Sequence, residues 1–86
     1  MAYEVLASRA AQRDLRRLPP ETKERIGKAI RALREEPRAK AQKLAAEDAY
    51  RIRVGDYRIV FRVDDDAREV LIARVKHRRD VYRRRG

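Results

Sequence analysis

The N-terminal part of the chain begins with a strand pattern that leads into a helical one. Residues 2–8, AYEVLAS, have the aromatic and β-branched content that is typical of a short strand. Ser8 is suited to cap a following helix. In that helix, apolar residues recur at helical spacing and form one stripe, at Ala11, Leu15 and Leu18. The pattern therefore predicts a strand followed directly by a helix.

A second helix is predicted over residues 21–36. Pro19 and Pro20 end the first helix and begin this one, because proline is tolerated in a first helical turn but not inside a helix. Its apolar face consists of Ile26, Ala29, Ile30 and Leu33. Pro37 ends the helix, and the short connection predicts that the two helices form an antiparallel pair. Residues 38–48 have little apolar periodicity and are expected to form a connecting segment.

Three strand patterns follow. Residues 50–54 and 57–63 flank Gly55-Asp56, and a two-residue Gly-X loop favours a tight type II′ hairpin. After a turn at 64–68, residues 69–75, EVLIARV, are so continuously apolar that we expect a strand buried on both faces. The tail is expected to form a last helical turn or to stay irregular. The order strand, helix, helix and three strands predicts an α+β fold, with two helices on one face of a mostly antiparallel sheet.

The predicted hairpin gathers basic side chains on one face. With this loop, Arg53 lies directly opposite Arg58, and alternation puts both on the face away from the helices, together with Arg51. Like charges directly opposite each other destabilise a sheet by roughly a few tenths of a kcal/mol. An anion held between them turns this repulsion into a net attraction. Two guanidinium groups at this spacing can present paired N–H donors to one phosphate. A sheet face that carries solvated arginines, or a general nucleic-acid groove, would show the same pattern.

Composition supports a polyanionic partner and excludes several kinds of site. The 86 residues are enough for one domain, 1–86, and carry 24 basic against 14 acidic side chains, a net charge of +10. A genome that favours arginine codons would give the same excess. The positions of the charges therefore have to distinguish a binding surface from a codon bias. The absence of cysteine and the single histidine argue against a protein-held metal, and no cofactor is expected. The chain shows neither a membrane span nor a signal peptide, and we expect a cytoplasmic protein.

A second basic cluster, residues 74–85, follows the last predicted strand. His77 is the one side chain whose ordinary pKa permits proton transfer near neutrality, although a lone histidine is more often structural. Arg78 and Tyr82 are spaced to share one side of a helical turn, where the ring can stack on a base while the arginine contacts its phosphate. Residues 83–85 have the composition of a solvated basic tail, and substitutions there are expected to weaken the binding of a polyanion in a salt-dependent way.

Two segments resemble the RelE branch of the RelE/ParE toxin superfamily: YRIRVGDYRIVFRVDDD at 50–66 and ARVKHRRDVY at 73–82. The resemblance covers nearly the whole chain. It implies two N-terminal helices on a twisted antiparallel sheet, similar to that of microbial ribonucleases. It also implies a cytoplasmic endoribonuclease that needs no metal, cuts mRNA in the ribosomal A site, and is neutralised by a small, acidic antitoxin encoded beside it.

The resemblance assigns roles to individual residues. Arg51 and Arg53 match the two basic positions of the first hairpin strand, and Arg58 opens the second. Arg78 matches the arginine after the last strand, and Tyr82 the tyrosine that closes the motif. With His77, which is a candidate by its ordinary pKa and only a secondary one by the resemblance, the catalytic candidates are Arg58, Arg78, Arg53, Tyr82 and His77. The RNA-binding candidates are Arg51, Arg53, Lys76, Arg79 and Arg83. Some family members have lysine at both hairpin positions and glycine at position 76. Because arginine does not readily lose its proton, a base role held by lysine does not transfer to Arg53.

Two other functions fit the same fold. A ParE-like toxin inhibits DNA gyrase without cutting RNA, and the combination of four arginines with Tyr82 argues against it, since ParE members generally lack this set. The chain could instead be an RNA-binding module without catalytic activity.

Overall fold

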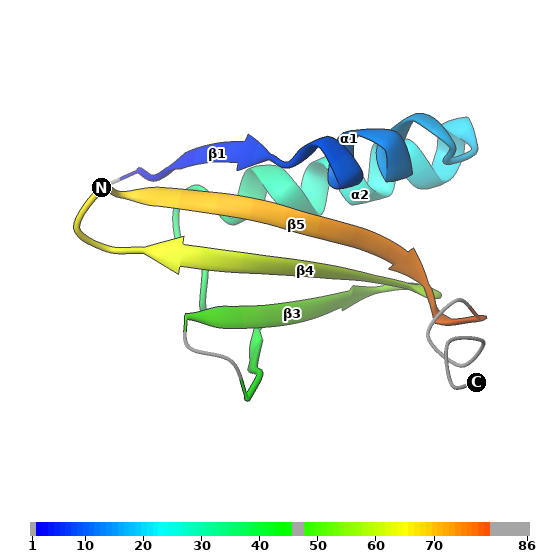
Figure 1. Cartoon of the computed structure of the whole chain (residues 1–86). Helices are drawn as coiled ribbons and strands as arrows, with labels where there is room; N and C mark the ends of the chain where they lie inside the picture. Colours follow the sequence, from blue (N-terminus) through cyan, green and yellow to red (C-terminus); the bar gives the residue numbers. More distant parts are fainter. Residues whose placement is uncertain (1, 46–47, 80–86) are drawn as a thin grey trace.

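Five strands form one mixed sheet with two helices on one of its faces, as Figure 1 shows. In this computed structural model of the chain, residues 2–45 and 48–79 are described. The elements are β1 (Glu4–Ala7), α1 (Arg9–Arg16), α2 (Pro20–Ala32), β2 (Gln42–Lys43), β3 (Ala49–Val54), β4 (Tyr57–Asp64) and β5 (Glu69–His77). The strand order is β1-β5-β4-β3-β2, and only the β1–β5 pair is parallel. The predicted α+β fold is confirmed.

The helices begin where the sequence predicts, but the second ends early. The Ser8 hydroxyl accepts a hydrogen bond from the Ala11 amide and donates one to the Ala73 carbonyl, so the cap of α1 also ties the helix to β5. Pro20 occupies the first turn of α2. That helix ends at Ala32 and not at residue 36, because residues 33–35 tighten into turns. The two helices run in opposite directions over the sheet (Figure 1).

The hydrophobic core lies between the helices and the middle strands. Its largest fully buried side chains are Phe61, Ile26, Ile59, Ile72 and Val70. On the other face of the sheet, Leu6 and Leu71 lie opposite each other on β1 and β5 and are 40% and 38% exposed. The prediction that residues 69–75 are buried on both faces is therefore wrong. The run is apolar because β5 is a central strand, but no helix of the described chain covers its second face.

The segment expected to be a connection contributes a short edge strand. Gln42 and Lys43 pair with Arg51 and Tyr50, which adds β2 to the edge of β3. Both β2 side chains are exposed, so the strand has no apolar alternation from which it could be predicted. No helix in the described part of the chain has the length and apolar character needed to cross a membrane.

One carboxylate fastens α1 to the C-terminal end of β5. β1 stops at Ala7, opposite Ile72, and beyond that point Asp14 of α1 accepts hydrogen bonds from the Val75 amide and the Arg74 guanidinium, with Oδ2 at 2.8 Å and 2.9 Å. Burial alone would raise the pKa of Asp14. The hydrogen bonds from Arg74 and Val75 and the charge of Arg74 outweigh burial and hold this pKa below its ordinary value of 3.8.

We expect Asp14→Ala to lower the free energy of unfolding by about 1–3 kcal/mol at pH 7, because the Val75 amide loses its acceptor. Because the pKa of Asp14 is lower in the folded protein than its ordinary value of 3.8, the ionised carboxylate stabilises the fold at pH values above 3.8. This contribution is lost as the pH falls through the pKa that Asp14 has in the folded protein. The two proteins should therefore converge in stability in acid. Urea unfolding across this pH range measures the effect, with exposed Asp66→Ala as control. Equal stability of the Asp14 and Asp66 variants at pH 7 would contradict it.

Candidate active site

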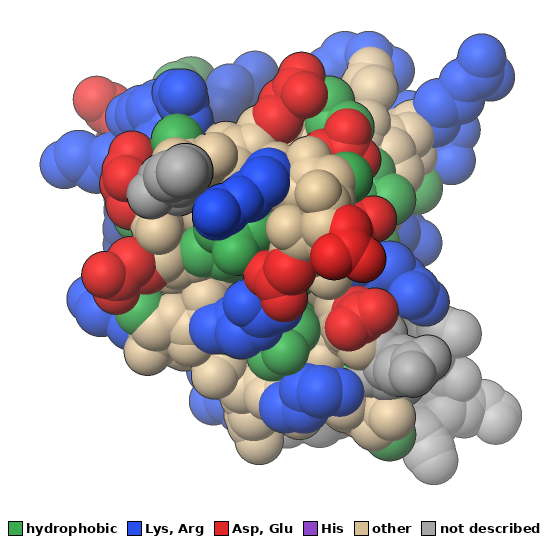
Figure 2. Space-filling model, turned by 90° about the vertical axis from the view of Figure 1, so that its left-hand side faces the viewer, with side chains coloured by type: hydrophobic (Ala, Val, Ile, Leu, Met, Phe, Trp, Pro, Cys, Tyr) green, Lys and Arg blue, Asp and Glu red, His purple; other side chains and the backbone are tan. Residues whose placement is uncertain are grey.

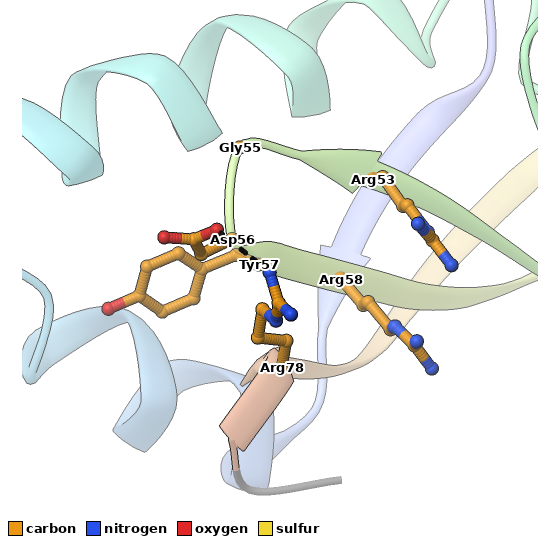
Figure 3. Close-up of a pocket in the computed structure, with 6 residues that line it drawn as sticks. All are labelled: Arg53, Gly55, Asp56, Tyr57, Arg58 and Arg78. Atoms are coloured by element: carbon orange, nitrogen blue, oxygen red, sulfur yellow. Dashed lines mark ion pairs between the residues drawn. The ribbon is translucent and has the colours of Figure 1, made fainter.

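A pocket lies at the turn between β3 and β4 (Figure 3). β5 finishes at the same end of the sheet (Figure 1). The lining residues of the pocket are Arg53, Gly55, Asp56, Tyr57, Arg58 and Arg78. They come from the β3–β4 hairpin and from the residue that follows β5. The pocket is therefore built from two segments about twenty positions apart in the sequence.

Three cations form a row across three neighbouring strands. Arg53 on β3 pairs with Arg58 on β4, as the sequence predicts, and Arg58 pairs in turn with Lys76 on β5. In Figure 3 the side chains of Arg53 and Arg58 extend in the same direction, away from Tyr57. Within residues 2–45 and 48–79, no hydrogen bond or ion pair engages the side chain of Arg53 or of Arg58. Both guanidinium groups are thus available to an anion.

The hairpin turn requires glycine. Gly55 has φ +61°, which matches the first central position of the predicted type II′ turn. A Cβ at this position would lie 3.3 Å from the guanidinium nitrogens of Arg25, which reaches the turn from α2. The turn sets the register of β3 and β4, and that register places Arg53 opposite Arg58.

Arg78 joins the pocket through the same turn. Its amide donates a 2.7 Å hydrogen bond to the Asp56 carbonyl, and its Nη1 lies 3.8 Å from the Asp56 Oδ1. Figure 3 shows the Arg78 side chain reaching back toward the turn, with the ion pair dashed. Arg78 and Arg79 begin a helical turn directly after β5. The chain thus brings Arg53, Arg58 and Arg78 together, as the sequence analysis expects.

His77 is not brought into this pocket. It pairs with Tyr57, whose side chain packs against the core on the helix side, and the two rings meet edge-on with centroids 5.0 Å apart. Its Nδ1 accepts a hydrogen bond from the Arg79 amide, so the neutral ring carries its proton on Nε2. Arg79 and His77 line a neighbouring hollow with Asp56 and Arg78. His77 therefore lies on the other side of the sheet from the row of cations.

The remaining predicted residues lie elsewhere. Arg51 shares the open sheet face, but its Nε and Nη2 donate to the Gln42 side chain at 3.2 Å and 2.8 Å, outside the pocket. Tyr82 and Arg83 lie outside the described residues. Sequence reasoning did not assign Asp56 to the site. Its place in the two-residue loop, directly between the two arginine-bearing strands, was the available signal.

Charge is distributed unevenly along the molecule. Asp56 is the one acidic side chain that lines the pocket, whereas the opposite end carries acidic residues among its cations, as Figure 2 shows. There Asp65 accepts hydrogen bonds from Arg38, at 2.8 Å and 3.2 Å, and from the Tyr3 hydroxyl at 2.7 Å. These bonds lower the pKa of Asp65 below its ordinary value. In the pocket, three arginines accompany the single carboxylate of Asp56, and this excess of positive charge attracts a polyanion.

The chemistry open to this pocket follows from its side chains. Arginine stays protonated, so Arg53, Arg58 and Arg78 can bind and polarise a phosphodiester but cannot take a proton from it. Guanidinium groups that contact the same phosphate stabilise the extra negative charge of a pentacoordinate phosphorus. Among the described residues, no group of three or more His, Asp or Glu side chains is arranged to hold a metal ion.

Comparison with known proteins places the chain in a family. The sequence model of the ParE toxin of type II toxin–antitoxin systems matches residues 5–82. Toxin RelG from Mycobacterium tuberculosis is 39% identical over 87 aligned residues, which span 98% of this chain and all of the relative. Most of the chain, including both arginine-bearing segments, is thus aligned with known toxins.

Solved structures show the same fold. The RelBE2 toxin–antitoxin complex from Mycobacterium tuberculosis contains a chain with a TM-score of 0.82 and 32% identity, covering 90% of this chain and 92% of that one. The isolated RelE toxin from E. coli has a TM-score of 0.80 and 27% identity, covering 95% and 98%. Sequence and structure agree that this chain belongs to the RelE/ParE superfamily of toxins of type II toxin–antitoxin systems.

Proposed function

We propose that this chain is a ribosome-dependent endoribonuclease that cleaves mRNA, acts in the cytoplasm and is neutralised by a cognate antitoxin. The observation that carries the proposal is the pairing of Arg53 with Arg58 across the hairpin, with Arg78 in the same pocket. A pocket that presents several guanidinium groups fits the phosphodiester of an RNA backbone. The similarity to RelE and RelG toxins supports the RelE branch of the superfamily.

The proposed reaction is an attack of a ribose 2′-oxygen on the adjacent phosphorus. The bond from phosphorus to the 5′-oxygen breaks, which leaves a 2′,3′-cyclic phosphate and a 5′-hydroxyl, and the chemistry requires no metal. Arg53 and Arg58 stabilise the charge that develops on the non-bridging oxygens. Arg78 binds the scissile phosphate or stabilises the departing oxygen, and Lys76 and Arg79 bind neighbouring phosphates.

The groups that transfer protons in the proposed reaction are not the three arginines or His77. His77 lies on the far side of the sheet, and the three arginines keep their protons. If no other side chain of the site serves as an efficient base, most of the acceleration must come from orientation of the 2′-oxygen and from electrostatic stabilisation. Such an enzyme is slow on free RNA and depends on the ribosome to hold the mRNA in an in-line conformation. We propose that Tyr82 stacks on or orients a nucleotide base of the bound mRNA.

The proposed partner is a small acidic antitoxin encoded beside the toxin gene. Structures of RelE chains in complex with RelB antitoxins, from Mycobacterium tuberculosis and E. coli among others, share the fold of this chain. The open, basic end of the sheet is complementary to an acidic segment. An antitoxin helix or strand that covers this end, or displaces the chain after β5, would block access to the pocket.

Mapping of mRNA 5′ ends tests the proposal. Purified protein is added to ribosomes programmed with a defined mRNA, and to the same mRNA without ribosomes. We expect new 5′ ends within codons placed in the A site, and at least tenfold fewer on free RNA. The cleaved fragments should end in a 2′,3′-cyclic phosphate. Absence of cleavage on programmed ribosomes, with protein shown to be folded, would refute the nuclease proposal.

The second candidate is a gyrase inhibitor, because the family model that matches the chain is that of ParE toxins. A supercoiling assay with purified DNA gyrase separates the two functions. Inhibition of supercoiling without any new mRNA ends would establish the ParE-like function. If RNA is bound but neither assay responds, the chain is an RNA-binding module.

A further inference from the structure

Asp56 holds an unusual place in the pocket, because it is an acidic side chain among cations. It lines the pocket with Arg53, Arg58 and Arg78, and also two neighbouring hollows, one beside His77 and one beside Arg25. Its carbonyl and its carboxylate both face Arg78, at 2.7 Å from the amide and 3.8 Å from Nη1. A single residue thus contacts the main chain and the side chain of Arg78.

We propose that Asp56 is the positioning residue of Arg78, an inference that rests on the proposed nuclease function. The hydrogen bond between the Asp56 carbonyl and the Arg78 amide fixes where the chain leaves β5. The carboxylate then selects the direction of a long, otherwise mobile side chain and turns its guanidinium toward the hairpin. Without the carboxylate, Arg78 samples many rotamers, and only some of them face the phosphate.

The carboxylate also limits where the phosphate can lie. Arg53 and Arg58 extend to one side of the pocket, whereas Asp56 lies on the turn beside Arg78 (Figure 3). A phosphate is repelled by Asp56 and attracted by the two hairpin arginines, so it approaches Arg78 from their side. At 3.8 Å and with 62% of the Arg78 side chain exposed, the ion pair is loose enough for Arg78 to contact the phosphate while it stays near Asp56.

Asp56→Asn removes the charge and keeps the shape. Because the ion pair is exposed, the melting temperature should change little. On programmed ribosomes we expect kcat to fall about tenfold, since Arg78 is no longer oriented. KM should stay the same or decrease, because a repulsive charge has been removed. Asp56→Glu should restore most of the kcat, and Asp66→Asn, in the turn at the far end of β4, should behave as wild type.

A spectroscopic measurement tests the contact without relying on cleavage. The guanidinium resonances of Arg78 are recorded by NMR in the wild type and in the Asp56→Asn, Asp56→Glu and Asp66→Asn variants. We expect a change in the first variant, recovery in the second and none in the third. Identical Arg78 spectra in the wild type and Asp56→Asn would overturn the inference. An unchanged kcat, or a lower kcat with a raised KM, would overturn it as well.

Failure of the proposed function is distinguishable from failure of this inference. If the wild type does not cleave mRNA, the nuclease proposal fails, and the NMR comparison alone decides whether Asp56 orients Arg78. If the wild type cleaves and the Asp56 variants match it in both kcat and Arg78 spectrum, the positioning role fails while the nuclease proposal stands.

Discussion

Arg58→Ala is expected to lower the rate of mRNA cleavage on programmed ribosomes by about 10²- to 10³-fold. Arg58 is the centre of the cation row, because it pairs with Arg53 on one side and Lys76 on the other. In the proposed mechanism it therefore contributes most directly to stabilising the charge on phosphorus, and loss of one such donor typically has an effect of about this size. Cleavage is measured as the appearance of new 5′ ends under single-turnover conditions.

The fold should tolerate this change. The Arg58 side chain lies on the open face of β4, whereas its neighbour Ile59 is fully buried on the other. Unfolding free energy should change by no more than about 0.5 kcal/mol, and antitoxin binding should persist. Arg62→Ala, an exposed arginine further along the same strand, is the matched control and should cleave as the wild type does. Undiminished cleavage by Arg58→Ala would defeat the assignment of the site.

Phe61→Ala is expected to lower the free energy of unfolding by about 3–5 kcal/mol. Phe61 is fully buried and pairs with Ile72 of β5, and its ring stacks against Tyr50 with centroids 5.9 Å apart. Its removal leaves a cavity that the surrounding sheet and helices cannot fill. Small domains have only about 5–15 kcal/mol in total, so a large share of the stability would be lost. Urea unfolding followed by circular dichroism measures the difference.

Leu71→Ala provides the comparison for this prediction. Leu71 is also a large apolar residue of a middle strand, but it lies on the open face and is 38% exposed. Its truncation should therefore lower the stability by less than about 1 kcal/mol. Similar losses in the two variants would mean that the open face contributes as much to stability as the helix-covered core, contrary to the burial pattern.

The hairpin could be predicted residue by residue because its signals are local. A two-residue loop that begins with glycine, between two alternating runs, determines both the turn and the pairing of Arg53 with Arg58. Ser8 and Pro20 likewise have local roles at the starts of helices, and both were predicted. Where all the residues of an interaction lie in one short stretch of sequence, the sequence pattern is sufficient to predict it.

The features that were missed depend on distant parts of the chain. β2 is held by its pairing with β3 and has no pattern of its own, and the exposure of Leu71 depends on which face the helices cover. The position of His77 follows from the register of β5, which contains a bulge opposite Val60 and Phe61. A bulge shifts the register, and its place cannot be read from alternation alone. The contact of Asp56 with Arg78 likewise joins residues 22 positions apart.

The position of β5 has a consequence for how the protein is made. β5 is the last strand of the described chain, yet it lies between β1 and β4, and in the described chain β1 pairs with no other strand. A nascent chain that stops before residue 69 therefore lacks the middle of its sheet and the carbonyl partners of β1. Because the ribosome releases β5 after the other strands, the sheet closes only once residues 69–77 have been made. Before that point the cation row lacks Lys76 and the pocket lacks Arg78, so a shorter nascent chain does not carry the complete site.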